Sequence, residues 1–204
     1  MVDPIDETTP TSQTGFLKRL YQRLTQVAGG FVPTLSLPGV YASNGDLWSA
    51  TYDFTGVGSG SNADVVIRNP EGSGKTVKMV SWGFASNGEG STSAYKGVDY
   101  PGGGTEDDAV NYKDAADGTH GFDFKRGTDL ITPSTGSRFD GGSYTASSSP
   151  GGRGSASAQY SSVEHDIPEG EAFACRFASS EADNAPIGHV VVAEYPADRL
   201  FVPL

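Results

Sequence analysis

The sequence contains one cysteine, Cys175, and three histidines, His120, His165 and His189, in 204 residues. A single cysteine excludes a disulfide within the chain, and its place in the alternating run 172–177 predicts a buried thiol. No two histidines have the His-x-His or His-x-x-x-His spacing of a metal site, so we expect no metal centre and no cofactor. The chain also lacks a basic start with an apolar core and any run of membrane-spanning length. We therefore expect neither a secretory leader nor a spanning helix.

Long helical stretches are scarce, because 28 glycines and 12 prolines interrupt the chain. Short apolar runs recur between turns of Gly, Pro, Asn and Ser, which is typical of strands. The clearest runs are 47–54, 65–67, 77–84, 158–163, 172–177 and 187–195. Because helices do not alternate with these runs, we predict an all-β fold, a single jelly roll or β-sandwich.

Weaker patterns complete the predicted body. They indicate short strands at 93–100, 110–113, 122–124, 129–131, 137–139 and 143–146, with a long loop tract at 86–121 and a flexible loop at 147–157. Within the run 77–84, the apolar positions shift from Val77 and Met79 to Trp82 and Phe84. This shift predicts a bulge near Val80–Ser81 or burial on both faces.

An amphipathic helix is predicted over residues 14–28, after a polar arm at 1–13. Apolar side chains recur there at helical spacing, and Gly29 and Gly30 end the pattern. An isolated helix of this length is only marginally stable in water, so we predict that it contacts a neighbouring subunit or a membrane. Packing on its own domain is the alternative. The predicted contact residues are Phe16, Leu17, Lys18, Arg19, Leu20, Tyr21, Arg23, Leu24 and Val27.

The chain therefore divides into an arm with its helix, residues 1–38, and a β-sandwich body, residues 39–204. The segment 31–41 that joins them contains two prolines and is predicted to be extended.

The formal net charge of -11 belongs to the body, because the cations and carboxylates of residues 1–30 balance. An acidic body repels nucleic acid, whose binding relies on Lys and Arg displacing counterions, so we expect no nucleic-acid partner. Lysine is rare, and this composition favours a halophilic source, since molar salt screens charges beyond about 3 Å. An ordinary acidic surface is the alternative.

The segment Gly72-Ser-Gly-Lys-Thr76 has the end of a phosphate-binding loop without its beginning. Asn69 stands where the first glycine belongs, and a strand pattern follows where a helix is required. We interpret the segment as a hairpin turn.

No residue set singles out catalytic chemistry, and we expect no enzyme. The acidic clusters 106–108 and 114–117 miss the register of a calcium loop and are interpreted as a solvated face, with loose cation binding as the alternative. Carboxylates are plentiful, but no two of them stand out as a glycosidase pair.

Three short motifs resemble those of virion proteins. They are the turn Asn69-Pro-Glu-Gly-Ser-Gly-Lys, the turn Ile167-Pro-Glu-Gly-Glu and the strand Gly188-His-Val-Val-Val-Ala-Glu-Tyr. With the acidic, lysine-poor composition, they make the chain similar to jelly-roll capsid proteins of haloarchaeal viruses of the tailless icosahedral type with an internal membrane. The likeness covers residues 47–85 and 158–196.

The resemblance implies a structural virion protein, a self-assembling capsid or shell component that forms oligomers with itself and other capsid proteins. It implies location in the virion and a contact of residues 14–28 with a neighbouring subunit or the internal viral membrane. A spike, turret or tail component is an alternative. A carbohydrate-binding β-sandwich module is another, with Trp48, Tyr52, Trp82, Tyr95, Tyr100 and Tyr112 as candidates for stacking on sugars.

Overall fold

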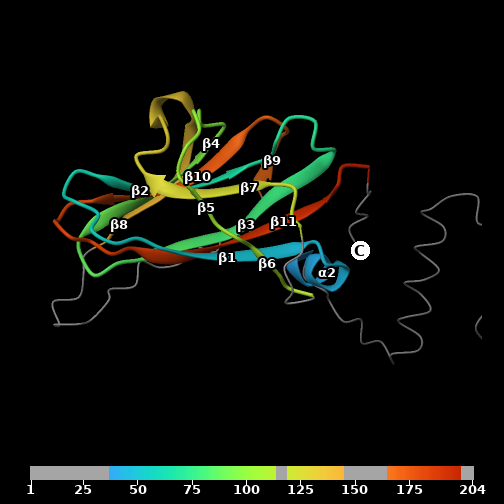
Figure 1. The fold of residues 1–204 in the computed structure, drawn as a ribbon, viewed down its shortest axis with the longest axis horizontal. Coiled ribbons are helices and arrows are strands. Elements are labelled where there is room, and N and C mark those ends of the chain that lie inside the picture. Colours follow the sequence, from blue (N-terminus) through green and yellow to red (C-terminus); the bar gives the residue numbers. More distant parts are fainter. Residues whose placement is uncertain (1–36, 114–118, 145–164, 199–204) are drawn as a thin grey trace, which may run out of the picture. The chain divides into compact units, whose positions relative to one another are not determined.

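The computed structural model describes residues 37–113, 119–144 and 165–198 (Figure 1). The chain divides into two compact units, residues 1–36 and 37–204, and all described residues belong to the second. The predicted arm and helix at 1–28 therefore lie outside the described residues. The predicted strand at 158–163 and loop at 147–157 also lie outside them.

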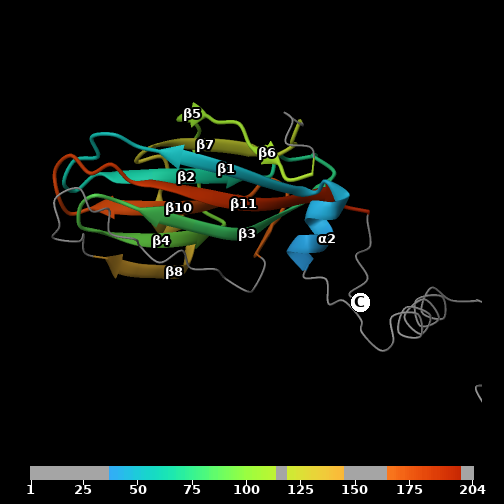
Figure 2. The same cartoon turned by 90° about the horizontal axis from the view of Figure 1, so that it is seen from below.

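Antiparallel strands form two sheets that lie as two layers (Figures 1 and 2). In spatial order, the first sheet contains β6 (Val110–Asn111), β1 (Leu47–Asp53), β11 (Ile187–Pro196), β3 (Lys75–Ala85) and β9 (His165–Ile167). The second contains β5 (Thr105–Glu106), β7 (Asp123–Thr128), β2 (Asn62–Arg68), β10 (Ala172–Ser179), β4 (Gly90–Lys96) and β8 (Ser137–Tyr144).

The strand order is that of a jelly roll. β1 pairs with β11, β2 with β10, β3 with β9 and β4 with β8, so that the pairs are nested from the chain ends inward. The chain crosses between the sheets at each step from β1 to β4 and again from β8 to β11. This arrangement is the double Greek key of a jelly roll. The predicted all-β jelly-roll fold is therefore confirmed.

The inner faces of the two sheets are apolar because inward side chains alternate with outward ones along each strand. The buried interior includes Trp48, Tyr52, Val65, Ile67, Val77, Met79, Trp82, Phe84, Phe124, Phe173, Cys175, Phe177, Val190 and Val192. Phe84 of the first sheet and Phe177 of the second meet with ring centroids 6.0 Å apart. The predicted burial of Cys175 is confirmed, since its side chain is fully enclosed.

β3 contains the predicted bulge. Its register against β11 shifts between Val191, which faces Ser81, and Val192, which faces Met79. Val80 is therefore an extra residue without a partner position. The bulge reverses the alternation, which is how Met79 and Trp82 both face the interior.

The prediction of an extended segment at 31–41 is wrong for its last five residues, which lie in helix α2 (Leu37–Asn44). Pro38 is the second residue of this helix, a position where its missing N–H is not needed. Gly45 ends the helix with a φ of 80°. Tyr41 of α2 stacks on Tyr195 of β11, with ring centroids 5.6 Å apart, so α2 packs on the outer face of the first sheet.

The predicted strand at 129–131 is also wrong, because these residues form a loop over the outer face of the second sheet. Beneath it, the Arg176 guanidinium on β10 donates two hydrogen bonds, of 2.6 and 2.7 Å, to the Asp64 carboxylate on β2. The amides of Leu130 and Ile131 also donate to Asp64, and Arg176 donates to the Ile131 carbonyl. The buried pair therefore holds the loop in place.

The strand boundaries in the middle of the chain differ from the predictions. The predicted strand at 122–124 extends through Lys125 and Arg126 to Thr128 as β7, and the two predicted strands at 137–139 and 143–146 form one strand, β8. The predicted strand at 122–124 ended too early because the next two residues, Lys125 and Arg126, are charged. Both pair with carboxylates, Lys125 with Glu106 at 2.7 Å and Arg126 with Asp107 at 2.5 Å.

Replacing Arg176 with methionine should lower the free energy of unfolding by about 3–5 kcal/mol, because Asp64 is then left buried without its partner. The double variant Asp64→Leu/Arg176→Met should lose less, since no buried charge remains. Lys113→Met, at an exposed position next to β6, is the control and should change the free energy by less than about 0.5 kcal/mol. Urea unfolding monitored by tryptophan fluorescence measures each value. Equal losses in Arg176→Met and Lys113→Met would contradict this interpretation.

Candidate functional site

The predicted contact residues are Phe16, Leu17, Lys18, Arg19, Leu20, Tyr21, Arg23, Leu24 and Val27, and all lie outside the described residues. The structure therefore does not place the predicted site. It does show the outer surfaces of the body, and it shows that the turn motifs singled out in the sequence have structural roles.

The Gly72-Ser-Gly-Lys-Thr76 segment is a turn between β2 and β3. Its amides converge on a carboxylate of the same chain, because Gly72 N and Gly74 N donate to Glu169 at 3.2 and 2.9 Å. Successive backbone amides of this kind form an anion-binding nest. Glu169 occupies the nest, so the turn is a structural connection and not an open phosphate site.

Asn69 joins the same two turns. Its side-chain amide donates to the carbonyls of Lys75 and Ile167, and its carbonyl oxygen accepts a hydrogen bond from Ser73. The turn at 69–75 and the turn at 167–171 are therefore fixed to each other. Two of the three motifs on which the virion resemblance rests lie at this one end of the sandwich.

The three histidines lie apart in the fold. His120 stacks on Phe122, His165 lies on β9, and His189 lies half-buried on β11. Among the described residues, no three His, Cys, Asp or Glu side chains gather in an arrangement that could hold a metal ion.

The acidic cluster 106–108 contributes two of its carboxylates to ion pairs with β7, as described above. Burial raises the pKa of Asp107 above its ordinary value, Arg126 lowers it, and the nearby charges of Asp53 and Asp108 raise it further. The cluster 114–117 lies outside the described residues.

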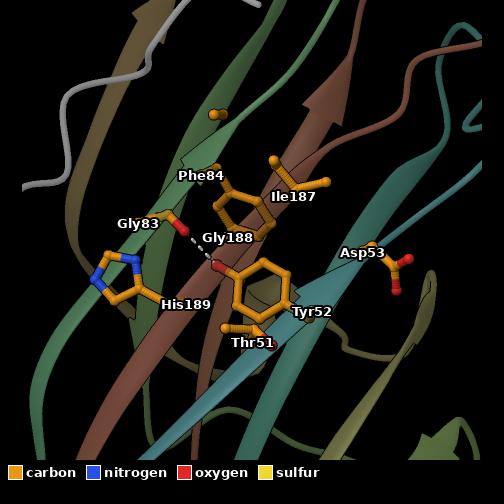
Figure 3. Close-up of a pocket in the computed structure, with 9 residues that line it drawn as sticks. Thr51, Tyr52, Asp53, Gly83, Phe84, Ile187, Gly188 and His189 are labelled. Atoms are coloured by element: carbon orange, nitrogen blue, oxygen red, sulfur yellow. Dashed lines mark hydrogen bonds between the residues drawn. The ribbon is translucent and has the colours of Figure 1, made fainter.

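The candidate site is a hollow of about 670 Å³ at the end of the first sheet far from α2. It lies over β1, β11 and β3 (Figure 3), and its lining residues are Thr51, Tyr52, Asp53, Gly83, Phe84, Ala85, Ile187, Gly188 and His189. Thr51 pairs with His189, and His189 with Gly83, so these three residues form one row across the sheet. The next row consists of Asp53, Ile187 and Ala85. Both rows face outward, because Tyr52 and Phe84 between them face the interior.

Two glycines shape the floor of the hollow. The Tyr52 hydroxyl donates a 2.5 Å hydrogen bond to the Gly83 carbonyl, which also lies against Gly188 (Figure 3). A Cβ atom at Gly188 would lie 2.0 Å from the Gly83 carbonyl oxygen and 2.6 Å from the Tyr52 hydroxyl. Only glycine therefore fits at position 188.

The loop next to the hollow is held by a buried amide. Asn184 donates to the Glu89 carbonyl at 3.0 Å and to the Ser179 hydroxyl at 2.6 Å, and it accepts from Ser86. The Phe54 amide donates to the Pro186 carbonyl at 2.9 Å. The margin of the hollow is therefore tied to three strand connections.

The polar groups of the hollow are few. Asp53 contacts Arg126 at 2.5 Å, yet its side chain remains 73% exposed. Burial lowers the pKa of His189 below its ordinary value, so its imidazole is neutral at pH 7. The hollow is therefore half-apolar, and its one carboxylate is already paired with Arg126.

Sequence reasoning did not find the hollow, because its residues come from three strands. One signal was available, since Gly83 and Gly188 interrupt two strongly apolar strand patterns and glycine inside a strand often marks a close approach.

The aromatic residues suggested for sugar stacking have different surroundings. Trp48, Tyr52 and Trp82 are buried in the interior, and their rings are enclosed by other side chains. Tyr95 and Tyr100 pack partly buried over the second sheet, and Tyr112 is 53% exposed.

No family model, curated protein or solved structure matches the chain. In the described part of the chain, no helix combines the length and the hydropathy needed to cross a membrane.

The His189 environment predicts a pH dependence of stability. Because burial lowers the pKa of the folded state, the unfolded chain binds a proton first as the pH falls below about 6.5. The folded chain should therefore lose stability below that pH, and His189→Gln should reduce this loss. Urea midpoints measured from about pH 7 to 5 test this prediction. The same loss of stability at low pH in His189→Gln and in the unmodified chain would contradict it.

Proposed function

We propose that this chain is a structural virion protein of a haloarchaeal virus, a self-assembling shell component whose jelly-roll body meets copies of itself and other capsid proteins. Its role is structural and not catalytic, and its N-terminal arm links neighbours. Eight-stranded jelly rolls build viral capsids, and they also occur in lectins and cupins. These classes differ in whether a ligand can bind in the space between the two sheets.

The filled interior carries this proposal. Cupins and ligand-binding barrels use the space between their sheets, whereas here Trp82, Phe84 and Phe177 meet in it. The aromatic residues of the interior are also unavailable for stacking on a sugar. The outer faces of the sheets and the loops are therefore the surfaces left for binding, as in a protein that assembles with other subunits.

The charge distribution supports assembly in concentrated salt. Several cations of the described body are engaged in ion pairs, namely Lys75, Lys78, Lys125, Arg126 and Arg176. Exposed carboxylates include Glu71, Glu89, Asp99, Asp108, Glu171, Glu181, Asp183 and Asp198. Subunits with such surfaces repel each other at low ionic strength, and molar salt screens this repulsion.

A carbohydrate-binding module is the second candidate. Tyr112 is exposed and lies beside the edge strand β6, where it could meet a sugar ring. A glycan array separates the two functions, since binding that is lost in Tyr112→Ala would favour the module.

The full chain should assemble in molar NaCl and dissociate as the salt is lowered toward about 0.1 M, where the Debye length reaches about 10 Å. Sedimentation velocity measures the size, and circular dichroism reports at each salt concentration whether the chain is still folded. A folded monomer at every salt concentration would contradict the proposed function.

Deletion of residues 1–30 should leave a folded body that no longer assembles, because the described strands bury their own core and the arm provides the link. Light scattering in molar NaCl compares the deletion with the full chain, and urea unfolding verifies the fold. Normal assembly of the deletion variant would show that the arm is not the tether.

A further inference from the structure

We propose that a second pocket of the body binds a single uncharged sugar ring, and that Arg68 is the main donor of hydrogen bonds to it. The pocket belongs to the second sheet, whereas the hollow over β1, β11 and β3 belongs to the first. The inference goes beyond the proposed function and does not rest on it, because it concerns a ligand and not a contact between subunits.

The pocket has a volume of about 310 Å³ and is built from four segments. These are the end of β2, the stretch after β4, the turn before β10 and the short 3₁₀ helix η1 (Pro133–Thr135). Pockets that enclose whole ligands span about 300–1,000 Å³, so this one lies at the lower limit. It therefore suits one six-membered ring, and any further rings of a glycan would lie in solvent.

Arg68 is the only cation among the residues that line the pocket. It is partly buried on β2, two residues after Val66, which packs in an apolar cluster on the outer face of the second sheet. Because side chains alternate along a strand, Arg68 faces the same side. Asp123 is its neighbour on β7, but no described residue forms an ion pair or a hydrogen bond with the Arg68 guanidinium. Its N–H donors are therefore available to a ligand.

Other cations of the second sheet differ from Arg68 in this respect. Lys125, Arg126 and Arg176 all form ion pairs with carboxylates of the described body. In a chain with a net charge of -11, a guanidinium that lines a pocket without such a pair is the exception that points to a ligand.

Two carboxylates complete the charged lining of the pocket. Asp99 follows β4 and Glu171 precedes β10, and both are exposed and form no ion pair with a described residue. An anion such as phosphate is disfavoured, because two carboxylates outweigh one guanidinium. A simple cation is disfavoured by the charge of Arg68. The lining therefore suits an uncharged ligand that both donates and accepts hydrogen bonds.

The hydroxyl groups of a sugar meet this requirement, since each of them both donates and accepts. They can accept hydrogen bonds from Arg68 and donate hydrogen bonds to Asp99 and Glu171, and bonds of this kind to charged groups are stronger than those between neutral groups. Tyr100 adds a partly buried aromatic side chain to the lining. Its hydroxyl donates to the Gly103 carbonyl, which holds the ring in place as an apolar surface for the C–H groups of a sugar.

Hydrogen bonds between the segments fix the walls of the pocket. The Gly97 amide donates to the Ala172 carbonyl at 3.1 Å and joins the stretch after β4 to β10. The Asp99 amide donates to the Thr135 hydroxyl at 2.8 Å and joins the same stretch to η1. A pocket that is already ordered loses little conformational entropy when a ligand binds.

Saturation-transfer NMR on the full chain in molar NaCl tests this inference. The probes are the methyl glycosides of glucose, galactose, mannose and N-acetylglucosamine, each added separately, with glycine and methyl phosphate as charged probes. A ligand of this size with ordinary ligand efficiency binds with a Kd of about 1 mM. At least one glycoside should give a signal with a Kd near this value, and the two charged probes should give none.

Arg68→Met should raise the Kd of that glycoside about tenfold, because the hydrogen bonds to the charged guanidinium are lost. Lys113→Met is the matched control, since it removes one cation at an exposed position outside the pocket, and it should leave the Kd unchanged. Glu171→Gln retains the size of an exposed side chain and removes its charge, so it should also weaken binding. Urea midpoints verify that the three variants fold, and Glu171→Gln decides the test if Arg68→Met does not.

Absence of a signal from all four glycosides would overturn the inference, and so would an equal Kd in a folded Arg68→Met variant and the unmodified chain. Binding that is lost in Tyr112→Ala and retained in Arg68→Met would assign the sugar to the edge of the first sheet. A signal from glycine or methyl phosphate alone would assign a charged ligand to the pocket. Both of these results would also overturn the inference, and the proposed assembly is decided separately by sedimentation.

Discussion

The two sheets fill the space between them with their own side chains, and the fold of the described residues depends on this packing. Phe84 and Phe177 meet across the interior, and Trp82 lies edge-on to Phe84. Each Å² of apolar surface removed from water stabilises the fold by about 25 cal/mol. The large aromatic side chains of the interior therefore contribute much of the stability. A partner would therefore contact the outer faces, and the outer face of the first sheet carries the hollow over β1, β11 and β3.

Polar anchors fix the two ends of the sandwich. At one end, Glu169 occupies the amide nest of Gly72 and Gly74, and at the other, Asn184 binds the connections around it. These contacts hold glycine-rich turns in single conformations without large apolar side chains. The proposed role in a shell would require such defined surfaces, because the same contacts must repeat around a closed symmetric assembly.

Much of the fold could be predicted from strand periodicity and turn chemistry, including the bulge at Val80, because these signals are local. Features that depend on distant residues could not be predicted. Asp64 and Arg176 are 112 residues apart in sequence, and their pairing turns residues 129–131 into a covering loop. α2 was missed because Pro38 stands in the first turn, where proline is tolerated. The hollow combines three strands, and no single stretch of sequence describes it.

Electron microscopy of the full chain in molar NaCl tests the central claim most directly. The jelly-roll body, the acidic surface and the arm together predict regular assemblies, with uniform capsomers or closed particles built from many copies. Lowering the salt should convert these particles into separate subunits of the size of one sandwich. A field of uniform single molecules in molar salt, with no larger particles, would contradict a structural role in a shell.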